Sequence, residues 1–281
     1  MIIAIETRLV IRTRTPTDIL LQYEAAAIPD QTIISASDAL SDAGSSTRIA
    51  GDENIGTRRW VRLDGEIEVS YRAEAEPRRL DCDLAALDSL PVERLPADAV
   101  KYLFDSRYCQ SDSFQSYAAS TFEDPIGGRK IEAMRDWVAR NIAYVPGSSH
   151  SETTTRDTLM ERRGVCRDFA HVLITMARAC AIPARYVAVY SPAVDPQDFH
   201  AVAEVFLCDP ATADGGAWYL VDPTGMACAA DAVKIGVGRD AADVSFLTSF
   251  GACELTGKSV QVLRKAPAPL TQFPLASLQG T

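Results

Sequence analysis

One cysteine of this chain stands where a thiol could act as a nucleophile. Cys166 follows Gly164 and directly precedes an apolar segment, residues 168–180, that is expected to be a helix. A helix N-terminus favours the thiolate over the thiol, and the backbone N–H of Cys166 could help to bind an oxyanion. Three arginines nearby are expected to favour the anion further: Arg162, Arg163 and Arg167.

Two downstream segments could supply a base and a carboxylate. His200 precedes residues 201–207, and Asp222 ends the apolar segment 218–222; both segments are expected to be strands. An imidazole can take the proton of a thiol, and a carboxylate can fix the tautomer of that imidazole. The order cysteine, histidine, aspartate therefore indicates acyl-transfer chemistry.

Other residues compete for the same roles. Asp198 and Glu204 lie close enough to His200 in sequence to replace Asp222 as its partner. His171 would point about 140° away from the thiol on a helix, which favours a structural role. His150 lies in a polar segment, where it could line a cleft or have no role at all.

Two further interpretations remain open for these side chains. A free cysteine is most often a small buried hydrophobic residue, and this describes Cys180, Cys208, Cys228 and Cys253. A metal site could be composed of four residues, although they lack the usual ligand spacing: Cys166, His171, His200 and Asp222.

Composition excludes several classes of protein. A net charge of −10 over 281 residues, with no run of Lys and Arg, argues against nucleic acid or an anionic membrane as partner. No apolar run reaches the roughly 20 residues of a membrane span, and residues 1–6 resemble a strand more than a signal peptide. Seven cysteines without a CxxC pair predict neither a zinc site nor a disulfide framework. We expect a cytoplasmic protein, because no segment of the sequence directs export.

The periodicity changes along the chain. Residues 5–12, 60–63 and 67–72 alternate as strands do, with one possible short helix near residues 19–27. This predicts an N-terminal β-sandwich-like domain over residues 1–95 and a second domain over residues 96–281.

The second domain is expected to mix helices and strands. Short or medium helices are predicted over 100–104, 126–142 and 156–162, the last with Thr155 as its N-cap. A further strand is predicted over residues 185–190.

Taken together, several motifs resemble the bacterial transglutaminase-like superfamily. They comprise residues 164–170, 181–187, 200–204 and 222–224, with weaker matches at 106–112 and 238–244. The resemblance implies an α+β fold: a β-sandwich-like domain, then a papain-like core in which a helix bearing cysteine packs on an antiparallel sheet bearing histidine and aspartate. Many relatives have tryptophan two residues after the histidine, whereas this chain has Val202.

The same resemblance implies roles for three residues. Cys166 would be the nucleophile, His200 the general base and acid, and Asp222 the orienting carboxylate; Arg167 and Asp168 also match the bacterial pattern. The expected reaction is acyl transfer on a peptide or carboxamide through a thioester, without a cofactor or metal. Hydrolysis is our preferred outcome, with transfer to an amine or a non-catalytic peptide-binding module as alternatives. The partner would be a peptide or protein.

Overall fold

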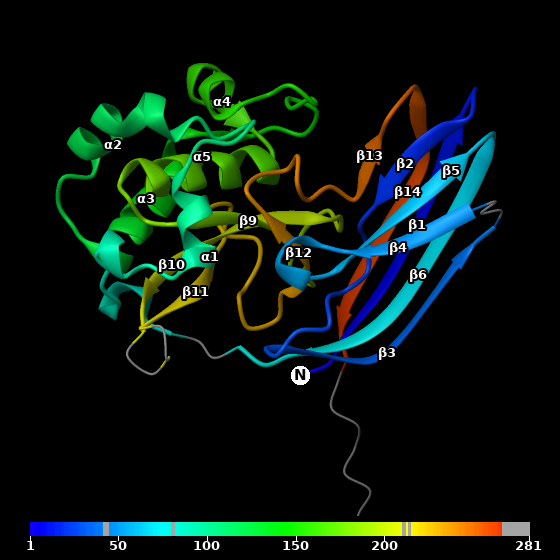
Figure 1. Ribbon diagram of the computed structural model, residues 1–281, viewed down its shortest axis with the longest axis horizontal. Coiled ribbons are helices and arrows are strands. Elements are labelled where there is room, and N and C mark those ends of the chain that lie inside the picture. Colours follow the sequence, from blue (N-terminus) through cyan, green and yellow to red (C-terminus); the bar gives the residue numbers. More distant parts are fainter. Residues whose placement is uncertain (42–44, 80–81, 210–211, 213–214, 266–281) are drawn as a thin grey trace, which may run out of the picture.

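The structure is a computed structural model that describes residues 1–41, 45–79, 82–209, 212 and 215–265. A β-sandwich lies on one side of the molecule, and helices packed on a separate sheet lie on the other (Figure 1). This is the mixed fold with antiparallel sheets that the sequence predicted.

The sandwich consists of two four-stranded antiparallel sheets. The first has the order β14 (Cys253–Arg264), β1 (Ile3–Thr13), β6 (Glu66–Pro77) and β3 (Gln31–Leu40). The second has the order β13 (Leu247–Ser249), β2 (Thr17–Leu21), β5 (Thr57–Leu63) and β4 (Ser45–Ala50). Alternate residues of β1 are buried between the sheets, as a strand with one face on a core requires.

The helix expected near residues 19–27 is absent, and this prediction was wrong. Residues 17–21 form β2, in which Ile19 and Leu21 face the sandwich core while Asp18 is exposed. The apolar run is too short to decide between the two periodicities, and pairing with β5 and β13 decides it.

The C-terminal strands return to the sandwich. β14 pairs along its whole length with β1, and β13 pairs with β2. The expected division at residues 95 and 96 therefore does not account for residues 247–264, which join the first sheets instead of the second domain. Residues 266–281 of that expected domain lie outside the described residues.

The second region is built on another antiparallel sheet. Its order is β11 (Gly216–Val221), β10 (His200–Cys208), β9 (Ala184–Tyr190) and β12 (Val233–Gly238). Two longer helices, α3 (Gly127–Asn141) and α5 (Cys166–Ala179), cover one face of it. The predicted strands and the helix over 126–142 agree with these elements.

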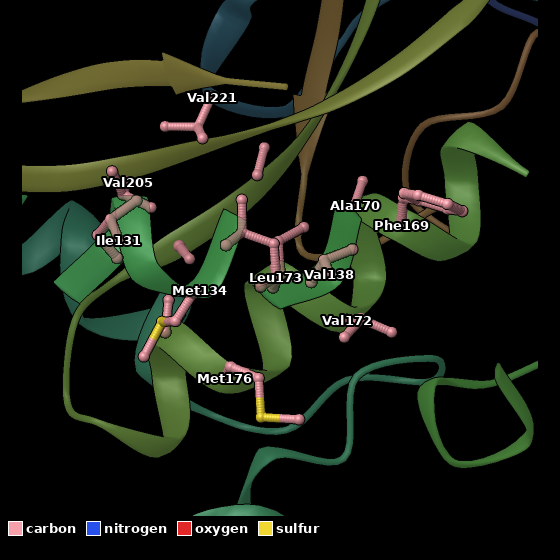
Figure 2. Close-up of a cluster of buried hydrophobic side chains, with 14 of the residues drawn as sticks. Ile131, Met134, Val138, Phe169, Ala170, Val172, Leu173, Met176, Val205 and Val221 are labelled. Carbon is pink, nitrogen blue, oxygen red and sulfur yellow. The ribbon is translucent and has the colours of Figure 1, made fainter. Parts of the chain in front are cut away.

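A closely packed apolar core joins these helices to the sheet. Ile131, Met134 and Val138 of α3 meet Leu173 of α5, and Val205 lies above them on the sheet (Figure 2). Side chains of this size each stabilise the fold by about 1.5–3 kcal/mol when fully buried. The start of α5 is thus fixed against the sheet by its own central turns.

Shorter elements complete the region. They are η1 (Asp52–Asn54), η2 (Leu84–Ala86), η3 (Val92–Arg94), α1 (Ala97–Val100), η4 (Lys101–Leu103), η5 (Ser111–Phe114), α2 (Gln115–Thr121), β7 (Ala143–Tyr144), α4 (Thr155–Glu161) and β8 (Arg163–Gly164).

Helix α4 begins one residue earlier than the sequence predicted. Its N-cap is Thr154 and not Thr155, because Thr154 and Asp157 form a reciprocal capping box, whereas Thr155 is buried inside the helix. Within the described ranges, no helix is both long and apolar enough to cross a membrane.

Candidate active site

The local fold at Cys166 places the thiol at a helix N-terminus. Cys166 is the first residue of α5 and is half-buried, with a free thiol. Asp168 accepts a hydrogen bond from the backbone N–H of Val165 at 2.9 Å, and Ser149 donates to the other oxygen of Asp168 at 2.9 Å. The turn in front of the cysteine is therefore held by a buried carboxylate.

Gly164 is required by the same turn. A Cβ at this position would lie 2.7 Å from Cβ of Asp168, which is closer than side-chain carbons normally approach. Burial raises the pKa of Asp168, and the hydrogen bonds from Val165 and Ser149 partly offset that effect. The glycine thus makes room for the carboxylate that caps the helix.

The three arginines expected to favour the thiolate have other partners. Arg162 lies over the ring of Trp137, and Arg163 pairs with Glu161. Arg167 donates to two backbone carbonyls of the loop before α4, those of His150 and Thr153, and stacks on Tyr108. The helix N-terminus and the histidine described next remain as the groups that lie at the thiol.

His200 lies between the thiol and a carboxylate. Its Nε2 is 2.8 Å from Oδ2 of Asp222, and Cys166 lies close enough to act on the charge of the ring. Burial opposes the imidazolium, but the hydrogen bonds and negative charges of Asp222 and Cys166 outweigh it and raise the pKa of His200 to about 9. The structure therefore brings together the three residues that the sequence singled out.

Asp222 is held by a turn that follows β11. Its carboxylate accepts hydrogen bonds from the backbone N–H of Thr224 at 2.8 Å, from the Thr224 hydroxyl at 2.7 Å and from the backbone N–H of Ala227 at 2.7 Å. Burial opposes ionisation, but these donors and His200 lower the pKa of Asp222. The carboxylate is thus ionised and fixed in orientation.

The alternative partners of His200 are engaged elsewhere. Glu204 is buried between Arg185 and Lys234, with Arg185 Nε 2.8 Å from its Oε2. Burial opposes its ionisation, but the charges of Lys234 and Arg185 lower the pKa of Glu204 to about 2. Asp198 pairs with Lys258.

The other two histidines lie apart from the thiol. His171 is fully buried, stacks on Tyr108 and accepts a hydrogen bond from the backbone N–H of Ala241 at 3.2 Å. Burial lowers the pKa of His171 far below its ordinary value. The exposed His150 belongs to the loop that Arg167 binds. Among the described residues, no group of three or more His, Cys, Asp or Glu side chains is arranged to hold a metal.

The sequence missed Tyr144, whose hydroxyl lies near the backbone N–H and the side chain of Cys166 and is affected by both. Burial, followed by the charge of Cys166, raises the pKa of Tyr144 to about 12. Parallel pairing of β7 with β8 places Tyr144 opposite Gly164, and its ring packs on Phe169 at 5.7 Å. A two-residue bridge of this kind has no periodic signal in the sequence.

Comparison with known proteins agrees with this geometry. Residues 114–223 match the family model of the transglutaminase-like superfamily. A solved structure described as "a Putative Cysteine Protease from Cytophaga hutchinsonii" is 31% identical, with a TM-score of 0.84, over 96% of this chain and 93% of that one. The chain belongs to the transglutaminase-like superfamily.

Two uncharacterised mycobacterial proteins are similar over part of the chain. One from Mycobacterium leprae is 30% identical over 122 residues, covering 42% of each chain. One from Mycobacterium tuberculosis is 32% identical over 150 residues, covering 48% of this chain and 46% of its own length. The chain thus spans less than half the length of these curated relatives.

Proposed function

We propose that this member of the transglutaminase-like superfamily is a cysteine-dependent hydrolase of peptide or carboxamide bonds. The observation that carries the proposal is the imidazole of His200, which is hydrogen-bonded to Asp222 and lies near Cys166 at a helix N-terminus. The family match and the resemblance to the protein described as "a Putative Cysteine Protease" support it.

The first half of the reaction would form a thioester. The thiolate of Cys166 attacks the carbonyl carbon, and the resulting oxyanion replaces the Tyr144 hydroxyl oxygen beside the backbone N–H of Cys166 and accepts hydrogen bonds from both groups. When the tetrahedral intermediate collapses, the bond to the amine breaks and the imidazolium of His200 donates its proton to the leaving nitrogen.

The second half would use the same histidine as a base. Neutral His200 takes a proton from water, the hydroxide attacks the thioester, and the acid leaves as Cys166 returns to the thiolate with His200 protonated. Tyr144, which lies beside the thiol, and Val145 are each 38% exposed, so water can approach Cys166 from this side. We therefore take water as the acceptor, and the assay with an added amine tests transfer.

The thiol chemistry can be tested without knowing the substrate. Iodoacetamide labelling across pH, read out by peptide mass spectrometry, is expected to modify Cys166 fastest of the seven cysteines near neutral pH. His200→Ala should slow that labelling, and Cys166→Ala should abolish it. Equal reactivity of all the cysteines would contradict the nucleophile assignment.

A second assay addresses the acceptor. Glutamine-containing and unrelated peptides are incubated with the protein, with and without a primary amine. The products are identified from their masses by mass spectrometry. Free acid in both reactions supports hydrolysis, and amide formation with the amine indicates a transglutaminase. A reactive Cys166 that turns over no peptide would favour a binding module. We propose the cytoplasm as its compartment, because thiols stay reduced there.

A further inference from the structure

The loop that leads into His200 lies against the β-sandwich. It comprises residues 191–199, between β9 and β10. Among the strands that the structure describes, β14 lies at the edge of its sheet, because it pairs with β1 on one side only. On its other side, the backbone N–H of Val262 donates to Oε1 of Gln197, and Nε2 of Gln197 donates to the carbonyl of Val262 at 3.0 Å.

The side-chain amide of Gln197 therefore binds β14 as a neighbouring strand would. A residue at a strand edge offers one donor and one acceptor, and a primary amide can satisfy both at once. Nε2 of Gln197 also donates to the carbonyl of Pro192 at 3.2 Å, which closes the loop on itself. One side chain thus fixes the loop both to the sandwich and to its own first turn.

The two residues between Gln197 and His200 contact the sandwich side as well. Asp198 pairs with Lys258 of β14 and accepts from the backbone N–H of Phe199 at 2.8 Å. The ring of Phe199 stacks on Phe246 with centroids 4.7 Å apart and planes within 2°. Three consecutive residues in front of the histidine are held by residues 246–262.

The start of the loop is anchored in the sandwich core. The hydroxyl of Tyr190, the last residue of β9, donates to the carbonyl of Tyr23 at 2.6 Å and accepts from the Thr7 hydroxyl at 3.1 Å. Tyr190 is fully buried among sandwich residues. Both ends of the loop are therefore fixed by the N-terminal region and the strands that return to it.

We propose that the β-sandwich holds the imidazole of His200 in place through this loop, with Gln197 as the positioning residue. The inference rests on the proposed function, in which His200 serves Cys166. The titratable groups that face His200 are Cys166 from α5 and Asp222 after β11, with Tyr144 beyond the thiol. None of them belongs to the loop, so a loosened loop would move His200 relative to both partners. Displacements of about 1 Å at a catalytic group lower rates by about a hundredfold.

The test uses the full chain and iodoacetamide as the probe. Gln197→Met keeps the length of the side chain and removes its hydrogen bonds to Val262 and Pro192. We expect the variant to stay folded by circular dichroism and thermal unfolding. Its labelling rate at Cys166 near neutral pH should fall about tenfold, and the rise of labelling should move to higher pH, because His200 no longer sits at the thiolate.

Two further variants complete the test: one is a control, and the other removes a second contact between the loop and β14. Gln115→Met changes an exposed glutamine of α2 and should leave the labelling profile unchanged. Lys258→Met removes the ion pair to Asp198 and should act in the same direction as Gln197→Met but more weakly, since both side chains are partly exposed. It keeps the inference testable if Gln197→Met does not fold.

The reference variant His200→Ala separates the two proposals. If His200→Ala leaves the pH profile of Cys166 unchanged, the proposed function fails. If His200→Ala changes the profile while Gln197→Met and Lys258→Met only lower the unfolding temperature, the loop is structural and the inference is overturned.

Discussion

Nε2 of His200 lies 2.8 Å from Oδ2 of Asp222, and that oxygen also accepts a hydrogen bond from the backbone N–H of Ala227. Nε2 of His200 is therefore occupied by the carboxylate of Asp222. The other ring nitrogen, Nδ1, is left for the thiol of Cys166. This relationship makes the role of Asp222 measurable.

Replacing Asp222 with asparagine should uncouple His200 from Cys166. The amide can offer its N–H to the imidazole and favour the wrong tautomer, so acylation of Cys166 by p-nitrophenyl acetate should slow by about a hundredfold or more. Burst-phase kinetics measures this. Asp64→Asn, at an exposed turn, is the matched control, and an equal effect of both changes would contradict the orienting role.

The proton on His200 should persist to unusually high pH. Its pKa is raised from 6.5 to about 9, so the stability that its charge contributes is complete below about pH 6.5 and is lost as pH rises through about 9. Imidazole NMR signals should show His200 titrating near pH 9 and at lower pH in Cys166→Ala. A midpoint near 6.5 in the wild type would refute the ion pair.

Tyr144→Phe should slow the acylation of Cys166 more than its alkylation by iodoacetamide. An oxyanion forms when a carbonyl is attacked but not when iodoacetamide is displaced, so loss of one donor should slow acylation by about 10- to 100-fold. The iodoacetamide rate should change far less. Comparable losses in both reactions would assign Tyr144 to the thiolate and not to the oxyanion. Tyr117→Phe, on the surface of α2, is the control.

Glu204→Gln should destabilise the fold without slowing the alkylation of Cys166. The substitution leaves the buried cations Arg185 and Lys234 without their shared carboxylate, which costs about 3–5 kcal/mol of unfolding free energy in urea titration. Because the pKa of Glu204 is lowered to about 2, its contribution is present above about pH 4.5 and is lost as pH falls toward 2.

The same variant distinguishes Glu204 from Asp222. Under conditions where Glu204→Gln is folded, Cys166 should be alkylated at the wild-type rate, because Glu204 pairs with Arg185 and Lys234 and not with His200. Slower alkylation of the folded variant would restore Glu204 as a candidate partner of the histidine.

The sequence by itself determined the candidate chemistry and the local elements. The glycine turn before Cys166, the apolar run after it and the strand periodicity around His200 are local patterns, and residues near in sequence decide them. The order of Cys166, His200 and Asp222 carried the family resemblance, which the comparisons confirmed at the level of the superfamily.

Only the tertiary structure decided which groups meet. Pairing of β14 with β1 joins residues about 250 positions apart. The residue pattern of either strand does not indicate which strand it pairs with. The same holds for Tyr144 beside Cys166, for the arginines that have other partners and for Gln197 on the edge of β14. Such contacts depend on packing between distant elements, because hydrogen bonds and ion pairs form wherever the closed chain brings the groups within reach.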